Sequence, residues 1–157
     1  MKIRDAAADF LAAKKIAVTG VSHAPAGHGS NAVYTWLKKN GYEAVAINPN
    51  AEEVEGDRTY PNLAAVPGGV EAVLIGTRPE HAEATMREAV DLGIRLVWMH
   101  RAMGGGSVSA SAAQYGRQHG VTVIDGGCPL MFAPNADVGH KAMCRVLTWT
   151  RKVPRTV

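Results

Sequence analysis

The sequence contains little cysteine, few aromatic residues and no long hydrophobic run. Its 157 residues hold only Cys128 and Cys144, and without a secretion signal such a pair is more often two free thiols than a disulfide scaffold. No apolar run approaches the roughly 20 residues that cross a bilayer, which excludes a transmembrane protein. We therefore expect a cytoplasmic protein, with one domain spanning residues 1–157.

Neither a targeting segment nor a strong charge is present. The N-terminal MKIRDAAADFLAAKK carries Asp5 and Asp9 inside its apolar part, so it predicts an amphipathic helix and not a signal peptide. The formal net charge of +3 is too small to indicate a nucleic-acid partner. It favours a small polyanionic ligand over a cationic one, and neither a membrane nor a nucleic acid is expected as partner.

Five short, nearly continuous apolar runs alternate with helical patterns. The runs are KIAVTGV (15–21), YEAVAIN (42–48), VEAVLIG (70–76), IRLVWMH (94–100) and VTVIDG (121–126). Such runs are typical of strands buried on both faces. Strand and helix in alternation predict the α/β class: a Rossmann-like, doubly wound, parallel five-stranded sheet in a three-layer α/β/α arrangement with right-handed crossovers.

Three details of this pattern can be checked. Gly41, Gly93 and Gly120 stand where the helices should end. A final helix begins at about Val138, with Ala142, Val146 and Trp149 on one face. The basic segment RKVPR follows it, with Arg151, Lys152 and Arg155. A cationic helix end of this kind is explained by the helix dipole and requires no further partner. The link PNAEEVEGDRTYPNLAAVPGG (49–69) is rich in turn residues and predicts only a short helix.

In such sheets a ligand binds at the carboxyl ends of the strands, where the strand order reverses. The loop after the first run, GVSHAPAGHGSN (20–31), has the composition of a phosphate cradle. Gly20, Gly27 and Gly29 allow close backbone approach, and Ser30 or Asn31 can cap the following helix. The spacing matches neither GxGxxG nor the Walker motif, so a flexible connection remains the alternative.

The ends of the second and third runs narrow the choice of ligand. NAD-binding domains usually place a carboxylate at the end of the second strand, but here Asn48-Pro49 stands there. This absence counts against dinucleotide redox chemistry. Thr77-Arg78-Pro79-Glu80 reads as a capping box with proline in the first turn. Arg78 could stack on a base or pair with a phosphate, or it could simply be solvated.

With these loops in view, the chain resembles the small CoA-binding domain proteins and, more distantly, the CoA-binding domain of the succinyl-CoA synthetase alpha subunit. The resemblance rests on IAVTGVS (16–22), AINPN (46–50), TYPNLAAVP (59–67), RPEHAEATMREAVDLGIRLVWMH (78–100) and GGCPLMFAP (126–134). These segments follow one another in the same order as in the family, from about Leu11 to Pro134, and so cover most of the chain. One departure is His100, where the family often has a glutamine after Trp-Met.

The resemblance implies coenzyme A or a short acyl-CoA as ligand. Its diphosphate would lie on the first loop, its adenosine near the second and third strand ends, and its pantetheine near the fourth and fifth. In this order the implied contacts are Gly20, Val21, Ser22, Ser30 and Asn31; Asn48, Pro49, Thr77, Arg78 and Pro79; and Met99, His100, Cys128 and Pro129. The synthetase needs further domains that this chain does not supply, so we expect a non-catalytic or accessory module whose protein partner is unknown.

Because of two residues, His100 and Cys128, an enzyme remains the alternative to a binding module. One is His100, which is followed by Gly104, Gly105 and Gly106 and by Ser107 as a possible N-cap. His100 could form a second anion pocket or act as an acid/base group. It could also be a solvated histidine beside a mobile glycine loop. Cys128 resembles the Cys-Pro near the CoA thiol, where it could form a mixed disulfide or stay inert; catalysis would require an activated thiolate. The open alternatives are an NAD(P)-linked oxidoreductase and a small acyl-CoA enzyme.

No metal site is expected. His23 and His28 lie in the first loop, and His140 and Cys144 have i, i+4 spacing in the last helix. Neither pair has the tight multi-ligand spacing of a structural zinc site. Solvated histidines explain both pairs.

Overall fold

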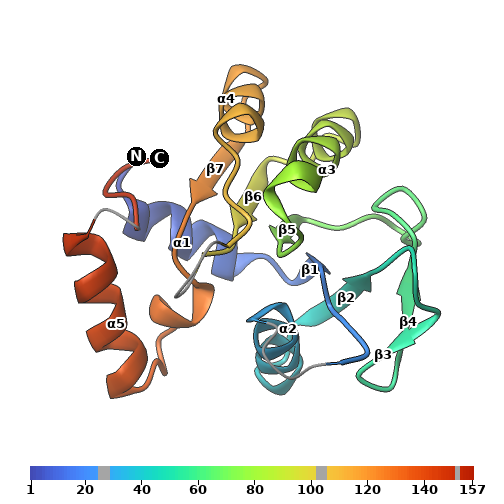
Figure 1. Cartoon of the computed structure of the whole chain (residues 1–157), viewed down its shortest axis with the longest axis horizontal. Helices are drawn as coiled ribbons and strands as arrows, with labels where there is room; N and C mark the ends of the chain where they lie inside the picture. The colour runs from blue at the N-terminus through green and yellow to red at the C-terminus, as the bar shows by residue number, and fades with distance from the viewer. Residues whose placement is uncertain (25–28, 102–105, 151–152) are drawn as a thin grey trace.

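The computed structural model describes residues 1–24, 29–101, 106–150 and 153–157. Gly27, His28, Gly104, Gly105, Arg151 and Lys152 of the sequence predictions lie outside these ranges. In chain order the elements are α1 (Ile3–Ala12), β1 (Lys15–Thr19), α2 (Gly29–Lys39), β2 (Glu43–Ile47), β3 (Glu53–Val54), β4 (Asp57–Tyr60), β5 (Ala72–Ile75), α3 (Pro79–Asp91), β6 (Leu96–Met99), α4 (Ala110–Gln118), β7 (Thr122–Asp125), the short 3₁₀ helix η1 (Pro129–Met131) and α5 (Val138–Trp149) (Figure 1).

The strands form one sheet in the order β3-β4-β2-β1-β5-β6-β7. Every neighbouring pair is parallel except β3 and β4. The five strands predicted from the apolar runs are all present, each shorter than its run because residues at the ends of the run belong to the adjoining loops. The chain runs outward from β1 to β2 and then returns to β5 on the other side, so the strand order reverses between β1 and β5. The Rossmann-like fold predicted from the sequence is confirmed.

The sheet is larger than the predicted five strands. The link after β2, described throughout, contains the β3–β4 hairpin and not the expected short helix. Glu55 and Gly56 form its two-residue turn, with φ angles of 51° and 78°, as a type I′ turn requires. β4 then pairs with β2, Ala46 lying opposite Thr59. Runs of two and four residues are too short for period-2 alternation to be recognised in a sequence.

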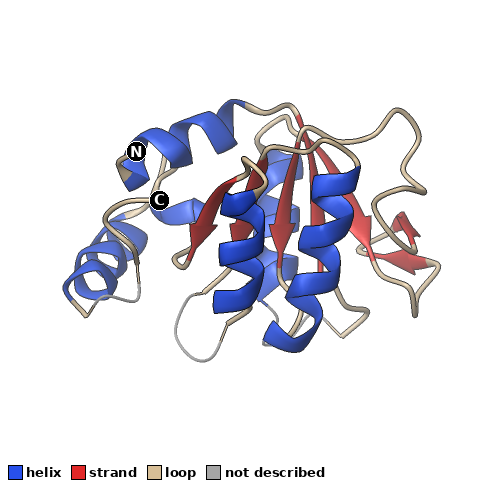
Figure 2. Ribbon diagram, turned by 90° about the horizontal axis from the view of Figure 1, so that it is seen from above, coloured by secondary structure: helices blue, strands red, loops and turns tan. Residues whose placement is uncertain are grey.

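Helices cover both faces of the sheet (Figure 2), and two hydrophobic cores lie between these helices and the sheet. Side chains of α1 and α2, among them Phe10 and Leu37, pack on one face. Those of α3 and α4, among them Met86 and Ala112, pack on the other. Trp98 of β6 is fully buried in the first core, with its ring 5.3 Å from that of Phe10. The three layers match the predicted α/β/α arrangement.

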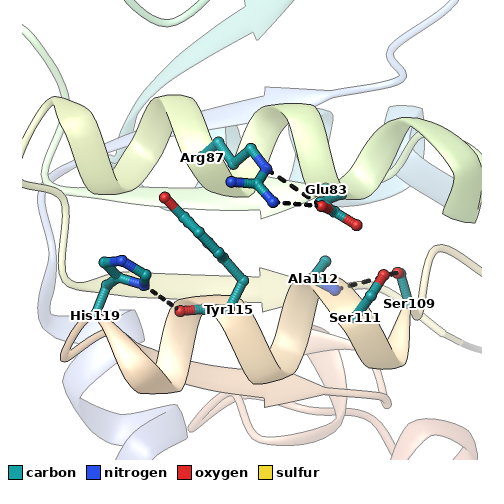
Figure 3. A network of polar contacts seen from close by, with 7 residues as sticks. All are labelled: Glu83, Arg87, Ser109, Ser111, Ala112, Tyr115 and His119. Atoms are coloured by element: carbon teal, nitrogen blue, oxygen red, sulfur yellow. Dashed lines mark hydrogen bonds and ion pairs between the residues drawn. The ribbon is translucent and has the colours of Figure 1, made fainter.

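Helices α3 and α4 lie side by side and are joined by polar and ring contacts (Figure 3). Arg87 pairs with Glu83 at 2.7 Å and places its guanidinium 4.1 Å from the centre of the Tyr115 ring. The Tyr115 ring in turn stacks on that of His119 at 4.1 Å. Such exposed contacts add little free energy each. The contact of Arg87 with Tyr115 joins α3, which carries one wall of the site described below, to α4.

The predicted ends of three helices are confirmed, and the predicted cap of α4 is corrected. Gly41, Gly93 and Gly120 follow their helices with φ angles of 84°, 75° and 76°, as glycines that end helices do. The cap of α4 is Ser109, which accepts a hydrogen bond from the Ala112 amide at 3.3 Å. Ser107, the predicted cap, is buried two residues earlier. Two serines so close together cannot be ranked by spacing alone.

Helix α5 stands apart from the sheet beside η1, at the edge of the molecule in Figure 1. Only Leu147 of this helix is fully buried. The predicted apolar face is turned outward: Val146 is 57% exposed and Trp149 is 83% exposed. Among the residues described, no helix combines the length and the apolar character that crossing a bilayer would require.

Candidate functional site

A crevice of about 390 Å³ lies at the carboxyl ends of β1, β2 and β5 and against α3. This is the side of the sheet where the strand order reverses, so its place is the one that the fold predicts for a ligand. Six predicted site residues line it: Gly20, Val21, Ser22, Asn48, Pro49 and Thr77. The other eight do not: Ser30, Asn31, Arg78, Pro79, Met99, His100, Cys128 and Pro129.

The floor of the crevice depends on two glycines that touch. Gly20 has a φ angle of 79°, and a Cβ atom there would lie 2.5 Å from the carbonyl oxygen of Gly76. A Cβ atom on Gly76 would lie 1.8 Å from the Oγ of Ser30. The sequence analysis expected Gly20 to leave room for an anion; in the structure its missing side chain leaves room for the β5 backbone.

Ser30 and Asn31 lie inside the first turn of α2 and not before it, so the prediction that one of them caps this helix is wrong. Ser30 Oγ donates to the Gly76 carbonyl at 3.3 Å. Asn31 holds both backbone groups of Ser22: its Oδ1 accepts from the Ser22 amide at 2.9 Å, and its Nδ2 donates to the Ser22 carbonyl at 2.8 Å. The same Nδ2 donates to Glu55 of the hairpin turn at 2.7 Å. Asn31 therefore shapes the start of the first loop.

Asn48 has a comparable role at the end of β2. Its Nδ2 donates to the Val21 carbonyl at 2.8 Å, and its Oδ1 accepts from the Asn50 amide at 2.8 Å. The side chain links the loop after β1 to the turn after β2. A carboxylate at this position could not donate to Val21, so the asparagine fits a structural task that the acid of NAD-binding domains could not perform.

Thr77 carries an unsatisfied polar atom. Its Oγ1 is buried and has no hydrogen-bond partner in the described structure. The cap of α3 is Arg78, without a side-chain hydrogen bond, and Pro79 occupies the first turn. The predicted capping box thus keeps its proline but not its threonine cap. An unpaired buried hydroxyl costs about 1–3 kcal/mol. Thr77 is one of the residues that line the crevice, so a rotation of its side chain would bring this buried hydroxyl to a ligand there.

His100 follows β6 and packs against the start of α2. A Cβ atom on Gly29 would lie 2.8 Å from Cε1 of the His100 ring. The ring is 8% exposed, and burial lowers the pKa of His100 below its usual value. Within the described ranges no hydrogen bond or ion pair is recorded for the ring. A neutral imidazole beside the first residues of a helix is able to donate a hydrogen bond to an anion there.

The remaining predicted residues are buried or exposed away from the crevice. Met99 is fully buried in the core under α3 and α4, and Cys128 is 5% exposed in the other core. Burial raises the pKa of the Cys128 thiol to about 11, so at neutral pH it is a thiol and a poor nucleophile. Pro129 is buried at the start of η1, and Arg78 is exposed.

One wall of the crevice was missed by the sequence analysis. It consists of one face of α3, with His81, Ala84, Thr85 and Glu88. These residues have the i, i+3, i+4, i+7 spacing of a single helix face, a signal that was available in the sequence. Glu88 accepts a hydrogen bond from the Ala64 amide at 3.0 Å and so ties this wall to the loop after β4.

A wider hollow of about 890 Å³ lies on the other side of Asn48 and Pro49. Glu52, Glu53 and Arg58 are among the residues lining it. Two carboxylates against one guanidinium are unfavourable for a polyphosphate. The narrower crevice, which has the unsatisfied Thr77 hydroxyl, is the better candidate for a nucleotide.

Comparison with known proteins identifies the family of this chain. Residues 14–134 match the family described as CoA binding domain. The YneT protein of Bacillus subtilis (strain 168) is 28% identical over 111 residues, which cover 71% of this chain and 78% of that protein. Acetate--CoA ligase (ADP-forming) II of Archaeoglobus fulgidus is 29% identical over 89 residues, which cover 55% of this chain and 13% of the ligase.

A solved structure shows the same fold. A hypothetical protein from Pyrococcus horikoshii OT3 superimposes with a TM-score of 0.76 at 23% identity, covering 87% of this chain and 96% of that one. The family match extends from the residue before β1 into the loop after η1, and so includes every strand of the sheet. The chain therefore belongs to the CoA binding domain family.

Proposed function

We propose that this protein binds coenzyme A or a short acyl-CoA, with the adenosine in the crevice and the diphosphate along the first loop toward His100. The observation that carries the proposal is the family match, combined with Thr77, a residue of the crevice lining whose buried hydroxyl has no hydrogen-bond partner in the described structure. The crevice volume of about 390 Å³ is at the lower end of the range of roughly 300–1,000 Å³ found for ligand sites. It suits part of a CoA molecule, so the rest would extend beyond it.

The described residues fit each part of CoA differently. Ser22, held by Asn31, begins the loop that would receive the diphosphate. The His100 ring, packed on Gly29, would donate a hydrogen bond to one of its phosphates. Arg78 is exposed at the start of α3, after the carboxyl end of β5, where its guanidinium would neutralise phosphate charge.

The residues expected near the pantetheine end of CoA do not support catalysis. Cys128 is buried, and its raised pKa disfavours the thiolate that nucleophilic catalysis needs. Met99 has no exposed surface to offer a substrate. We therefore assign the protein an accessory role: it holds CoA or acyl-CoA for another protein to use or sense. An acyl-CoA enzyme remains the alternative for which the third test below is designed.

The first test compares ligands. CoA should raise the melting temperature clearly and NAD should not, because a ligand that binds only the folded state stabilises it by about 2.7 kcal/mol at a hundredfold excess over Kd. The measurement is differential scanning fluorimetry with each ligand. A larger shift with NAD than with CoA would contradict the proposal.

The variant Thr77→Val tests whether CoA binds in the crevice. Valine has the shape of threonine without the hydroxyl, and this hydroxyl has no protein partner, so the free variant should be at least as stable as the wild type. Its affinity for CoA should fall about five- to tenfold, or roughly 1–1.4 kcal/mol. An unchanged affinity, measured by calorimetry, would move the ligand away from Thr77.

The second test uses pH. Burial lowers the pKa of His100 in the free protein, and a phosphate beside the ring would raise it again, so binding should take up a proton. The ratio of CoA affinities, wild type over His100→Gln, should therefore grow as the pH falls from about 8 to about 5.5, across the usual histidine pKa. Using the ratio cancels the titration of CoA itself. Parallel pH profiles would show that His100 does not meet a phosphate.

The third test separates a binding module from an enzyme. Wild type and Cys128→Ser are incubated with acetyl-CoA and succinyl-CoA, and the release of free thiol is followed. Because the Cys128 thiol is buried and protonated at neutral pH, neither protein should accelerate release. The CoA affinity of the variant should stay within about threefold of wild type, under about 0.7 kcal/mol. Release by the wild type that the variant lacks would make Cys128 an acyl carrier.

A further inference from the structure

A second groove lies far from the crevice, between α1, η1 and α5. Its volume is about 690 Å³, within the range of roughly 300–1,000 Å³ found for small-molecule sites. Two of its three walls, α1 and α5, fall outside the stretch of 14–134 that matches the family. It therefore belongs to this chain's own terminal segments and not to the family's common sheet.

Four basic side chains line the groove: Arg4, Lys141, Arg145 and Arg155. No acidic residue is among the described lining residues, and none of these four has an ion pair in the described structure. No aspartate or glutamate follows Asp137 in the sequence, and Asp5 and Asp9 of α1 are not among the lining residues. Unpaired cations that converge on a concave surface attract an anion.

The rest of the lining is mostly apolar. Ile3 of α1, Met131 and Phe132 at η1, and Trp149 of α5 contribute to it. Trp149 is 83% exposed, a large area for an indole ring to leave in water. An apolar surface bordered by cations suits a ligand that has both an aliphatic part and a negative charge.

The basic side chains come in two pairs, Arg4 with Arg155 from the two ends of the chain, and Lys141 with Arg145 from α5. Arg155 and Ile3 are joined through their backbones, the Ile3 amide donating to the Arg155 carbonyl at 3.1 Å, so Arg4 and Arg155 come from adjacent stretches of chain. Met131 and Phe132 belong to the other wall, at η1. Two guanidinium groups from neighbouring backbones are suited to a single carboxylate, which they can hold by charge-assisted hydrogen bonds.

We propose that this groove binds a single-chain anionic amphiphile, with its carboxylate at Arg4 and Arg155 and its aliphatic chain on Met131, Phe132 and Trp149. A second copy of the chain is a poor occupant, because α5 contains Lys141 and Arg145 but no acid, and two such helices would repel each other. A membrane surface meets a protruding face more readily than a concave one. The proposal does not depend on CoA binding in the crevice.

The probe is monomeric bromododecanoate, whose bromine quenches a nearby indole. Trp36 lies on α2, away from the groove, and Trp98 is buried behind Phe132 with its ring 5.6 Å from that ring, so Trp149, which lines the groove itself, is the main reporter and the Trp149→Phe variant measures the share that Trp98 contributes. We expect saturable quenching below the concentration at which the probe forms micelles, and the loss of most of it in Trp149→Phe. Dodecanol, which has the chain without the charge, and butyrate, which has the charge without the chain, should each compete at least tenfold more weakly than dodecanoate.

The variants test the two arginines. The double variant Arg4→Gln with Arg155→Gln should weaken dodecanoate by at least tenfold, because it removes two charge-assisted contacts. Lys14→Gln with Lys39→Gln removes two exposed cations elsewhere and should change binding by less than twofold. Arg145→Gln serves if the double variant does not fold, and should weaken binding severalfold. Circular dichroism checks the fold in each case.

A second readout is independent of fluorescence. Cys144 also lines the groove and is a free, partly exposed thiol, whereas Cys128 is buried. Dodecanoate should slow the modification of Cys144 by a thiol reagent. The proposal is overturned if bromododecanoate does not quench Trp149 and dodecanoate does not protect Cys144, or if dodecanol binds as well as dodecanoate. It is also overturned if only phosphatidylglycerol vesicles, and not the monomer, shift the Trp149 emission. A dimer seen by sedimentation, with Trp149 emission shifted on dimerisation, would overturn it as well.

Discussion

The contact between the backbones of Gly20 and Gly76 is the constraint on which the site depends. It brings the carboxyl ends of β1 and β5 together where the strand order reverses, and Ser30 of α2 closes on the same point. A side chain at either glycine would meet backbone or Ser30, so the first loop can leave the sheet here only with glycine at both positions. The place of the crevice, the path of the loop and the start of α2 all follow from this one contact.

The fold could be predicted from the sequence because its strands are apolar runs of the buried kind. β6 shows how such a run is used: Trp98 points into one core and Met99 into the other. The β3–β4 hairpin could not be predicted in this way, since it shows neither an apolar run nor a recognisable alternation. Its turn at Glu55 and Gly56 also lacks the Asn-Gly or Asp-Gly pair that marks such turns most strongly.

The edge of the sheet at which to look for a site was predicted from the sequence, because the carboxyl ends of parallel strands meet there. That CoA binds at this edge stays a prediction. The tasks of single residues were not predicted, since they depend on contacts between distant segments. Asn31 and Asn48 hold backbone groups of the first loop, and Thr77 keeps a free hydroxyl in place of a cap. The outward face of α5 was predicted as apolar, but its exposure depends on how far the helix stands from the sheet.

The central claim is that CoA binds at the carboxyl ends of β1, β2 and β5. The most direct measurement is a crystal structure of the protein with CoA. The account predicts the adenosine between Asn48 and Thr77, with the Thr77 hydroxyl hydrogen-bonded to the ligand, and the diphosphate on the loop that Asn31 holds. CoA in the wide hollow beside Glu52 and Glu53, or in the groove of α1 and α5 with the crevice empty, would contradict it.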